Sequence, residues 1–359
     1  MTYEILSNKW RPKKFDDVVG QNEAVFILKN SIKQNKLHHC YLINGAPGTG
    51  KTTIARIFSK CLNCELEITL TPCDNCNSCK SINTSSSMDT IELDAASKTK
   101  VEDIKDLINS SNYTTMYSRF KIYILDEVHM LSNSSFNVLL KTLEEPVKNT
   151  KYILITTNIN KIPETIISRS INLDLKRISY NEIYSRLIKI LETEKIKYNA
   201  ESIRLIAHFS NGSLRHAINT LEKIIILNDN IINYKYLENF IGIINKKKIY
   251  LLIILIHKKK LTKILKLTDL LNENTTDYNK ILDQIQIVLH EILIYKLNIK
   301  KIKFKKDRIM DIISNALNIK DIQEYYNSIS EEKNYIEYSP NIKLGFDFLI
   351  TKIILKKKS

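Results

Sequence analysis

The sequence predicts an α/β protein in which a parallel, helix-covered β-sheet is followed by a helical part. Two observations support this prediction. Over residues 38–175, short apolar segments alternate with helical patterns, which is the order expected of a parallel sheet with crossover helices. From Ile178 onward the apolar residues recur with helical spacing instead. We therefore expect a sheet domain and then helical domains.

The expected sheet has five strands, each a mainly apolar run. The expected strand ranges are 39–43, 89–93, 120–125, 152–157 and 171–175. Helices are expected over 53–60, 101–109, 179–195, 200–210, 213–228 and 234–241, with lysine- and isoleucine-rich helices after them. These changes of pattern divide the 359 residues into three expected domains, 1–178, 179–242 and 243–359.

The composition, with 43% hydrophobic and 26% charged residues, is that of a soluble globular protein. The net charge of +15 favours a polyanionic partner such as nucleic acid, although lysine is abundant throughout and many lysines would simply be solvated. The longest apolar run, 249–256, is far shorter than the ~20 residues that span a bilayer, so we expect a buried helix segment. Residues 1–10 hold no apolar core of a signal peptide. We expect a cytoplasmic protein without a membrane partner.

The pattern G-x-x-x-x-G-K-T follows the first expected strand and precedes a helix, which is the context of a phosphate-binding P-loop. Its residues are Gly45, Ala46, Pro47, Gly48, Thr49, Gly50, Lys51 and Thr52. Backbone N–H groups of such a turn point at phosphates, Lys51 adds positive charge, and the Thr52 hydroxyl can hold Mg²⁺. An ordinary glycine turn is the alternative, but three of only seven glycines lie here. The sequence predicts a nucleotide site.

Carboxylates follow the third expected strand. Asp126 and Glu127 stand where one carboxylate would support Mg²⁺ and the next would polarise an attacking water. An isolated Asp-Glu pair indicates little, but together with a P-loop it predicts nucleotide hydrolysis. Thr157 ends the fourth expected strand, where it would sense the γ-phosphate or would be an ordinary strand-end cap. Trp10 and Phe15 precede the first strand and would pack either over the nucleotide base or in the core.

Five of the six cysteines lie close together after the P-loop helix, within a module of about residues 61–82. They are Cys61, Cys64, Cys73, Cys76 and Cys79. Because a cytoplasmic chain does not hold structural disulfides, this spacing predicts a tetrahedral Cys₄ zinc site. An iron–sulfur cluster is the rival, although the Cys-Pro that usually follows is absent. Five cysteines compete for four places, so either Cys61 or Cys64 is spare.

Lys98 and Lys100 stand at the start of the helix expected over 101–109. Cations at a helix N-terminus oppose the helix dipole, so their position calls for another reason. A phosphate backbone would use both the lysines and the free N–H groups of the helix. Solvated surface charge is the alternative.

The combined motifs resemble the AAA+ ATPases, and within them the gamma/tau subunits of bacterial DNA polymerase III. The resemblance covers about residues 1–225 and rests on the P-loop, the Asp-Glu strand end and several further segments. These segments are Lys9-Trp10-Arg11-Pro12, Asp17-Val18-Val19-Gly20-Gln21, Asp94-Ala95-Ala96-Ser97, Thr99-Lys100-Val101-Glu102-Asp103, Asp126-Glu127-Val128-His129-Met130-Leu131 and Leu140-Lys141-Thr142-Leu143-Glu144-Glu145-Pro146.

This resemblance implies the ATPase motor of the clamp loader, with residues 179–242 as a helical lid and 243–359 as an oligomerisation collar. Its partners would be further copies of the chain, the delta and delta-prime subunits, the sliding clamp and primed DNA. Its cofactors would be ATP, Mg²⁺ and a structural Zn²⁺ on Cys64, Cys73, Cys76 and Cys79, which leaves Cys61 spare. No polymerase active site is expected.

By the same resemblance, Arg169 would be an arginine finger that completes a neighbouring subunit's site. Thr157 would be sensor 1 and Arg215 sensor 2, while Lys98 and Lys100 would face the DNA backbone. The chain departs from the family at Ser170, where the family has cysteine in a Ser-Arg-Cys motif, and in lacking the long tail of the tau form.

Two other functions stay open. Asp126-Glu127-Val128-His129 also fits the D-E-x-H box of a helicase, but such a helicase needs a second motor lobe, and residues 180–359 predict helices rather than alternating strands. The chain could instead be a scaffold that binds ATP without hydrolysing it. The presence of Lys51, Glu127 and Arg169 favours hydrolysis.

Overall fold

The computed structural model describes residues 5–97, 115–227, 231–232, 246–272, 278–297, 308–337, 339 and 341–355. The chain forms two compact units, Met1–Ile232 and Asn233–Ser359. The first unit holds the sheet and the helices up to Leu227, and the described part of the second unit is helical.

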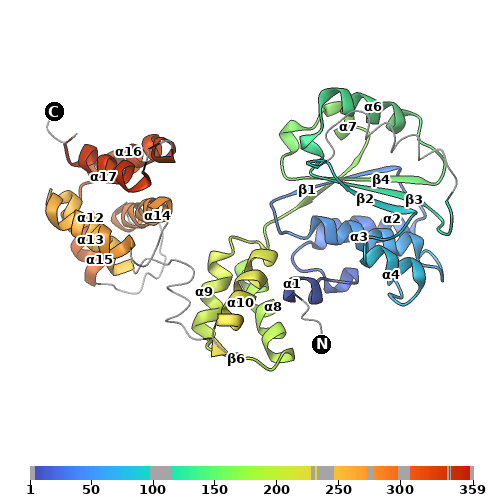
Figure 1. Ribbon diagram of the computed structural model, residues 1–359, viewed down its shortest axis with the longest axis horizontal. Helices are drawn as coiled ribbons and strands as arrows, with labels where there is room; N and C mark the ends of the chain where they lie inside the picture. Colours follow the sequence, from blue (N-terminus) through green and yellow to red (C-terminus); the bar gives the residue numbers. More distant parts are fainter. Residues whose placement is uncertain are drawn as a thin grey trace. The chain divides into compact units, whose positions relative to one another are not determined.

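Five parallel strands form the sheet of the first unit in the order β2-β3-β4-β1-β5, which confirms the predicted α/β class (Figure 1). The strands are β1 (Cys40–Gly45), β2 (Thr90–Asp94), β3 (Lys121–Asp126), β4 (Thr150–Thr156) and β5 (Ile171–Leu175). Because all of them are parallel, their carboxyl ends meet at one edge of the sheet. This edge carries the P-loop after β1, Asp126 at the end of β3 and Thr157 after β4.

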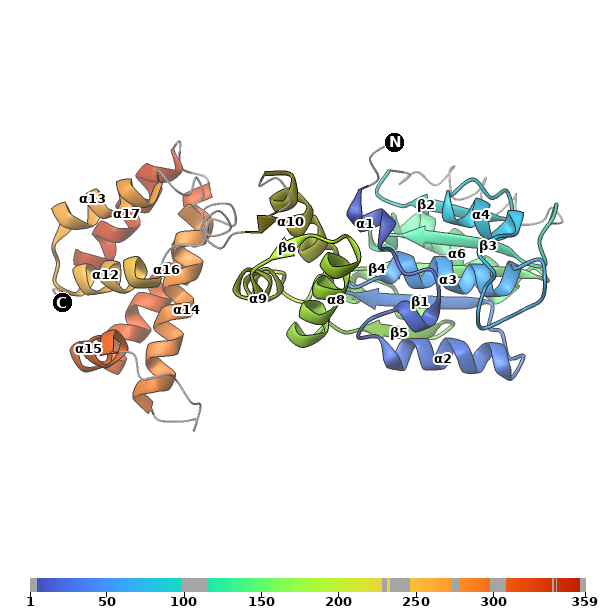
Figure 2. The same cartoon turned by 90° about the horizontal axis from the view of Figure 1, so that it is seen from below.

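Helices cover both faces of this sheet. Figure 1 shows α6 and α7 on one face and α3 with α4 on the other, and Figure 2 shows α2 beside α3 on that second face. The bounds are α1 (Leu6–Lys9), η1 (Phe15–Asp17), α2 (Asn22–Lys33), α3 (Lys51–Asn63), α4 (Asn77–Asn83), η2 (Val128–Met130), α6 (Asn133–Glu144), η3 (Ile159–Lys161) and α7 (Glu164–Ile167).

Alternate residues of the central strands enter two separate cores. Tyr41 and Ile43 of β1 pack in one cluster with residues of α2 and α3, whereas Cys40 and Leu42 pack in the other cluster with residues of α6. Successive side chains of a strand point to opposite faces, so a strand covered on both sides must be apolar throughout. This is why the strands appear in the sequence as continuous apolar runs.

Three helices follow the sheet within the first unit: α8 (Tyr180–Thr193), α9 (Ala200–Phe209) and α10 (Leu214–Leu227). A capping box between Ser179 and Glu182 begins α8, which explains the abrupt change of pattern after β5. Two-residue strands, β6 (Lys197–Tyr198) and β7 (Ile231–Ile232), pair in parallel beside these helices. Two residues are too few to show the alternation of apolar and polar side chains by which a strand is recognised in a sequence.

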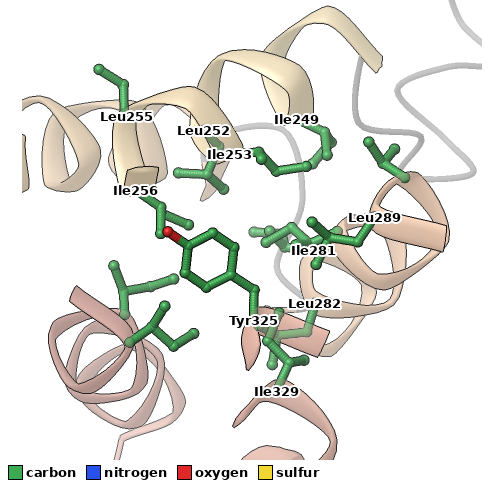
Figure 3. Packing of buried hydrophobic residues seen from close by; sticks show 14 of the residues in the cluster. Ile249, Leu252, Ile253, Leu255, Ile256, Ile281, Leu282, Leu289, Tyr325 and Ile329 are labelled. Atoms are coloured by element: carbon green, nitrogen blue, oxygen red, sulfur yellow. The ribbon is translucent and has the colours of Figure 1, made fainter. Parts of the chain in front are cut away.

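The second unit packs its described helices around one apolar cluster. The helices are α12 (Lys246–His257), α13 (Leu261–Asn272), α14 (Tyr278–Leu297), α15 (Arg308–Ala316), α16 (Ile319–Glu337) and α17 (Ile342–Leu355). The apolar run 249–256 lies in α12, and most of its side chains are buried against α14 and α16, with Tyr325 between Ile256 and Ile329 (Figure 3). Among the described residues, no helix is both long and apolar enough to cross a membrane.

Candidate nucleotide-binding site

The P-loop connects β1 to α3, as its sequence context requires. Gly48 and Gly50 adopt positive φ angles of 75° and 104°, which side chains rarely adopt. A Cβ atom at Gly48 would also overlap Ser213 Oγ at the start of α10, so only glycine allows this close approach. Lys51 then begins α3, and the free N–H groups of the first helical turn form an anion-binding end.

Lys51 is buried, and its side chain donates hydrogen bonds to backbone carbonyl groups of the P-loop. Its Nζ donates to Gly45 O at 2.9 Å and to Ala46 O at 3.2 Å. Burial lowers the pKa of Lys51, while the nearby carboxylates of Glu127 and Asp126 act in the opposite direction. Lys51 lines the same pocket as both strand-end carboxylates.

Asp126 faces the start of α3. Thr52 Oγ1 donates to Asp126 Oδ2 at 2.8 Å, and the backbone N–H of Glu127 donates to Asp126 Oδ1 at 2.9 Å. Burial raises the pKa of Asp126 despite these two hydrogen bonds. A hydroxyl and a carboxylate in this arrangement offer oxygen ligands for Mg²⁺.

Glu127 is held by residues at the neighbouring strand end. Its backbone is left-handed, with φ 50°, and its side chain accepts a 2.9 Å hydrogen bond from Thr157 Oγ1. His129 Nδ1 lies 3.3 Å from Glu127 Oε2 and 3.2 Å from Thr156 Oγ1. Thr157 therefore contacts the second carboxylate and does more than end a strand.

Lys51, Asp126 and Glu127 line one pocket in the first unit, to which four separate segments contribute charged groups. The P-loop contributes Pro47 to Thr52, the end of β3 contributes Asp126 and Glu127, and α10 contributes Arg215 with Leu214 and Ile218. The segment before the first strand contributes Arg11 and several apolar residues. The charged part of such a pocket offers partners for phosphate groups, and its apolar part offers a surface for a flat ring.

Residues 10–19, which we call the N-terminal strap, form that apolar part of the lining. Trp10, Pro12, Val18 and Val19 line the pocket, whereas Phe15 is buried in the core against α3. The two aromatic residues singled out in the sequence thus have different places. Trp10 lies at the pocket, and Phe15 lies in the core.

Contacts with the helices after the sheet hold the Trp10 ring. Its Nε1 donates to Glu194 Oε1 at 2.8 Å, and the Arg186 guanidinium lies 5.5 Å from the ring centroid. Lys9 forms an ion pair with Glu194 at 2.7 Å. Leu6 N also donates to the buried Glu222 of α10 at 2.8 Å. The start of the chain therefore contacts both the pocket and helices α8 and α10.

Two further polar residues of this site were not singled out individually in the sequence. Arg11 lines the pocket, and burial together with the charges of Arg56 and Arg215 lowers its pKa. Gln21 Nε2 donates to Lys176 O at 2.7 Å, and its Oε1 accepts from Lys176 N at 3.0 Å. Both belong to segments that carry the family resemblance, which is the signal that could have found them.

Arg169 lies apart from this pocket. It follows α7, and its Nη2 forms a 2.8 Å ion pair with Glu144 Oε1 at the end of α6. Its side chain is partly exposed and does not line the pocket of its own chain. Arg215, in contrast, lines the same pocket as Lys51 and Asp126.

Four cysteines gather beyond the C-terminal end of α3. The Sγ atoms of Cys64, Cys73, Cys76 and Cys79 lie within 4.8 Å of one another. A tetrahedral Zn–S₄ centre with Zn–S distances of about 2.3 Å places its sulfurs about 3.8 Å apart, so this set fits zinc. Cys61 lies elsewhere, fully buried with Sγ 3.8 Å from Leu70 O, and burial raises its thiol pKa to about 12.

The surroundings of the cysteine loop act differently on its thiols, because backbone donors lower the pKa of Cys73 whereas burial raises the pKa of Cys79. Backbone N–H groups of Cys76 and Asn75 lower the pKa of Cys73 to about 6. The N–H of Cys79 donates to Cys76 Sγ at 3.3 Å. Since metal binding requires deprotonated sulfur, these donors favour a metal site.

The proposed DNA-contacting residues, Lys98 and Lys100, lie outside the described residues, as do the helices expected over 101–109 and 234–241.

Comparison with known proteins identifies the family. The chain is 39% identical over 363 residues to the DNA polymerase III subunit gamma of Buchnera aphidicola subsp. Schizaphis graminum, with 100% of both chains covered. It is 38% identical to that of Buchnera aphidicola subsp. Baizongia pistaciae, covering 98% of this chain and 97% of that one. The DNA polymerase III subunit tau of Escherichia coli is 34% identical, and this chain spans 56% of its length.

A family model described as DNA polymerase III, delta subunit, matches residues 20–179, which hold the P-loop and the whole sheet. Among solved structures, the RuvB Holliday junction branch migration motor of Thermotoga maritima aligns with a TM-score of 0.49 at 18% identity, over 71% of this chain and 84% of that one. With full-length identity near two-fifths to the gamma subunits, the chain belongs to the gamma/tau family of DNA polymerase III subunits.

Proposed function

We propose that this chain is the ATP-hydrolysing motor subunit of the DNA polymerase III clamp loader, which places the sliding clamp on primed DNA. The observation that carries this proposal is the single pocket in which Lys51, Asp126 and Arg215 meet. These residues come from a P-loop, a strand end and a following helix. Membership in the gamma/tau family supports the same function.

Each residue of the pocket has a chemical role in this proposal. The P-loop N–H groups and Lys51 would bind the phosphates, and Thr52 with Asp126 would hold Mg²⁺. When bound, Mg²⁺ neutralises charge on the β- and γ-phosphates. Glu127 polarises the attacking water, and Thr157 orients that carboxylate through its hydrogen bond. Arg215, which lies on α10, binds phosphate oxygens.

Arg169 completes the site of a neighbouring subunit in this proposal. Its position away from its own pocket and its partly exposed side chain support such a role. An arginine supplied by a neighbour stabilises charge on the transferred phosphoryl group. The neighbours would be further copies of this chain and the delta and delta-prime subunits, assembled in the cytoplasm.

The domain roles follow the same proposal. Residues 179–242 would act as the lid over the nucleotide, 243–359 would form the collar that joins subunits, and Lys98 and Lys100 would contact the DNA backbone. Zn²⁺ on Cys64, Cys73, Cys76 and Cys79 would have a structural role, because all four places of a tetrahedral site are then filled by protein.

Single-turnover ATP hydrolysis by the reconstituted complex tests the function. We expect hydrolysis that requires both the clamp and primed DNA, and loss of nucleotide binding in Lys51→Met by about tenfold or more because charged hydrogen bonds are lost. Stimulation by DNA alone would indicate a helicase. Binding without any turnover would indicate a scaffold. Either result contradicts the proposed motor.

A further inference from the structure

One helix joins the P-loop to the cysteine cluster. Helix α3 begins at Lys51 and ends at Asn63, directly before Cys64. Its 13 residues span about 20 Å at 1.5 Å per residue. Both candidate sites therefore lie at the ends of the same rigid element.

A buried lysine near the end of this helix contacts the cysteine loop. The Lys60 side chain is 1% exposed, and its Nζ lies 2.5 Å from Asp74 Oδ1. Asp74 stands directly after Cys73, in a left-handed conformation with φ 59°. Since the loop between Cys73 and Cys76 fixes where Asp74 lies, the two cysteines determine whether this carboxylate reaches the lysine.

The same ammonium group also contacts the N-terminal strap. Lys60 Nζ donates to Lys13 O at 2.9 Å. Lys13 follows Arg11 and Pro12, which line the nucleotide pocket. One buried cation is thus shared between an aspartate of the metal-binding loop and a carbonyl of the segment that borders the nucleotide.

We propose that Lys60 is a positioning residue that makes nucleotide affinity depend on the occupancy of the Cys₄ cluster by its metal. This inference rests on the proposed function, which assigns nucleotide to one site and zinc to the other. With metal bound, the cysteine loop holds Asp74 against Lys60, and Lys60 holds the strap beside the pocket.

Loss of the metal removes this support in a defined order. Without the metal, Cys73 and Cys76 are no longer joined to a common ion, so the loop between them no longer fixes the position of Asp74. A buried ammonium group without its partner is strongly unfavourable, so Lys60 turns toward water. Its hydrogen bond to Lys13 O is then lost, and the strap no longer closes the apolar side of the pocket.

Two other sets of hydrogen bonds between described residues attach the module to segments outside the strap. Arg119 donates to the carbonyls of Cys64 and Glu65, the latter at 3.1 Å. Arg56 donates to Ser85 Oγ at 2.8 Å and pairs with Glu92. These contacts attach the module to β2 and to the segment before β3. Among the described residues, Lys60 is the side chain whose hydrogen bonds join the loop of Cys73 and Cys76 to the strap.

The test compares the affinity of a fluorescent ATP analogue for the full chain before and after zinc removal, with Mg²⁺ present and metal content measured. In the unaltered chain we expect zinc removal to weaken binding about tenfold, the size of one charged hydrogen bond. Lys60→Met should weaken binding similarly while zinc is bound, and zinc removal should then change it by less than about twofold.

Lys333→Met is the matched control, because it removes a Lys–Asp pair of the same 2.5 Å length in the second unit. It should respond to zinc removal as the unaltered chain does. Circular dichroism reports whether Lys60→Met folds. If it does not, Asp74→Asn keeps a hydrogen-bonding partner for Lys60 and should show a reduced response to zinc removal.

Two results would overturn the coupling. One is an affinity in the unaltered chain that does not change when zinc leaves. The other is an equal response to zinc removal in the unaltered chain and in the folded Lys60 or Asp74 variant. In both cases the proposed function survives, because nucleotide still binds. A zinc-loaded chain that binds no ATP analogue would instead refute the proposed function and the coupling with it.

Discussion

Thr157 Oγ1 donates a 2.9 Å hydrogen bond to Glu127 Oε2 and thereby links the carboxyl ends of β4 and β3. The bond occupies an oxygen of the carboxylate that we propose to polarise water. His129 lies beside the same oxygen at 3.3 Å. The direction of this carboxylate is therefore determined by residues of two strand ends.

Replacing Thr157 by valine keeps the shape of the side chain and removes the hydroxyl. We expect the hydrolysis rate to fall about tenfold, since a hydrogen bond to a charged group contributes about 1.5–3 kcal/mol. Nucleotide affinity should change little, because Thr157 does not line the pocket. Single-turnover hydrolysis and equilibrium binding measure the two effects. Thr157→Ser, which retains the hydroxyl, should behave as the unaltered chain; an equal loss in both variants would contradict the role of the hydrogen bond.

Asp126→Asn should separate stability from activity. Burial raises the pKa of Asp126, so its ionised form destabilises the nucleotide-free fold. Thermal unfolding at neutral pH should therefore show a higher Tm for Asp126→Asn. Mg²⁺-dependent hydrolysis should fall by about a hundredfold or more, because a Mg²⁺ ligand is lost.

The pH dependence of this stability difference has a defined sign. A raised pKa in the folded state means that folding favours the protonated carboxyl. The unaltered chain should thus match Asp126→Asn below the ordinary pKa of aspartate and lose stability relative to it as the pH rises through the raised pKa. A difference in Tm that is constant across this window would argue against the burial effect.

Arg169→Ala should act on neighbouring subunits. Assembly should persist, because the Arg169 pair with Glu144 lies within one chain and is partly exposed. Hydrolysis in a fully substituted ring should fall by about 10³–10⁵. Mixing substituted and unaltered subunits should lower the rate in proportion to the sites that receive no arginine. Unchanged hydrolysis in the fully substituted ring would refute a shared site.

Trp10, the only tryptophan of the chain, should report nucleotide binding directly. Because it lines the pocket and donates to Glu194, a bound base should change its fluorescence. Titration with ATP should give a saturable change. Trp10→Phe should lose this change and lower Tm, by about 2–4 °C for each kcal/mol of lost hydrogen bonding. A fluorescence signal that is insensitive to saturating ATP would place the base elsewhere.

The strands and the phosphate-binding turn were predictable because local rules decide them. Strands buried on both faces need continuous apolar runs, and the turn needs glycine at Gly48 and Gly50, where φ is positive. The ends of the strands were less predictable, since hydrogen bonding with neighbouring strands determines them. Thus β4 begins at Thr150, where Lys121 is its partner on β3, before the apolar run starts.

The sequence by itself predicted the parallel sheet, the P-loop turn and the cluster of cysteines, because these depend on residue types at fixed spacing along the chain. Only the tertiary structure decided which distant residues meet. It separates Trp10 from Phe15, directs Thr157 to Glu127, and buries Lys60 between Asp74 and the Lys13 carbonyl. Such contacts join segments far apart in the chain. A buried polar group needs a hydrogen-bonding partner because its burial is otherwise costly, and no local sequence pattern identifies that partner.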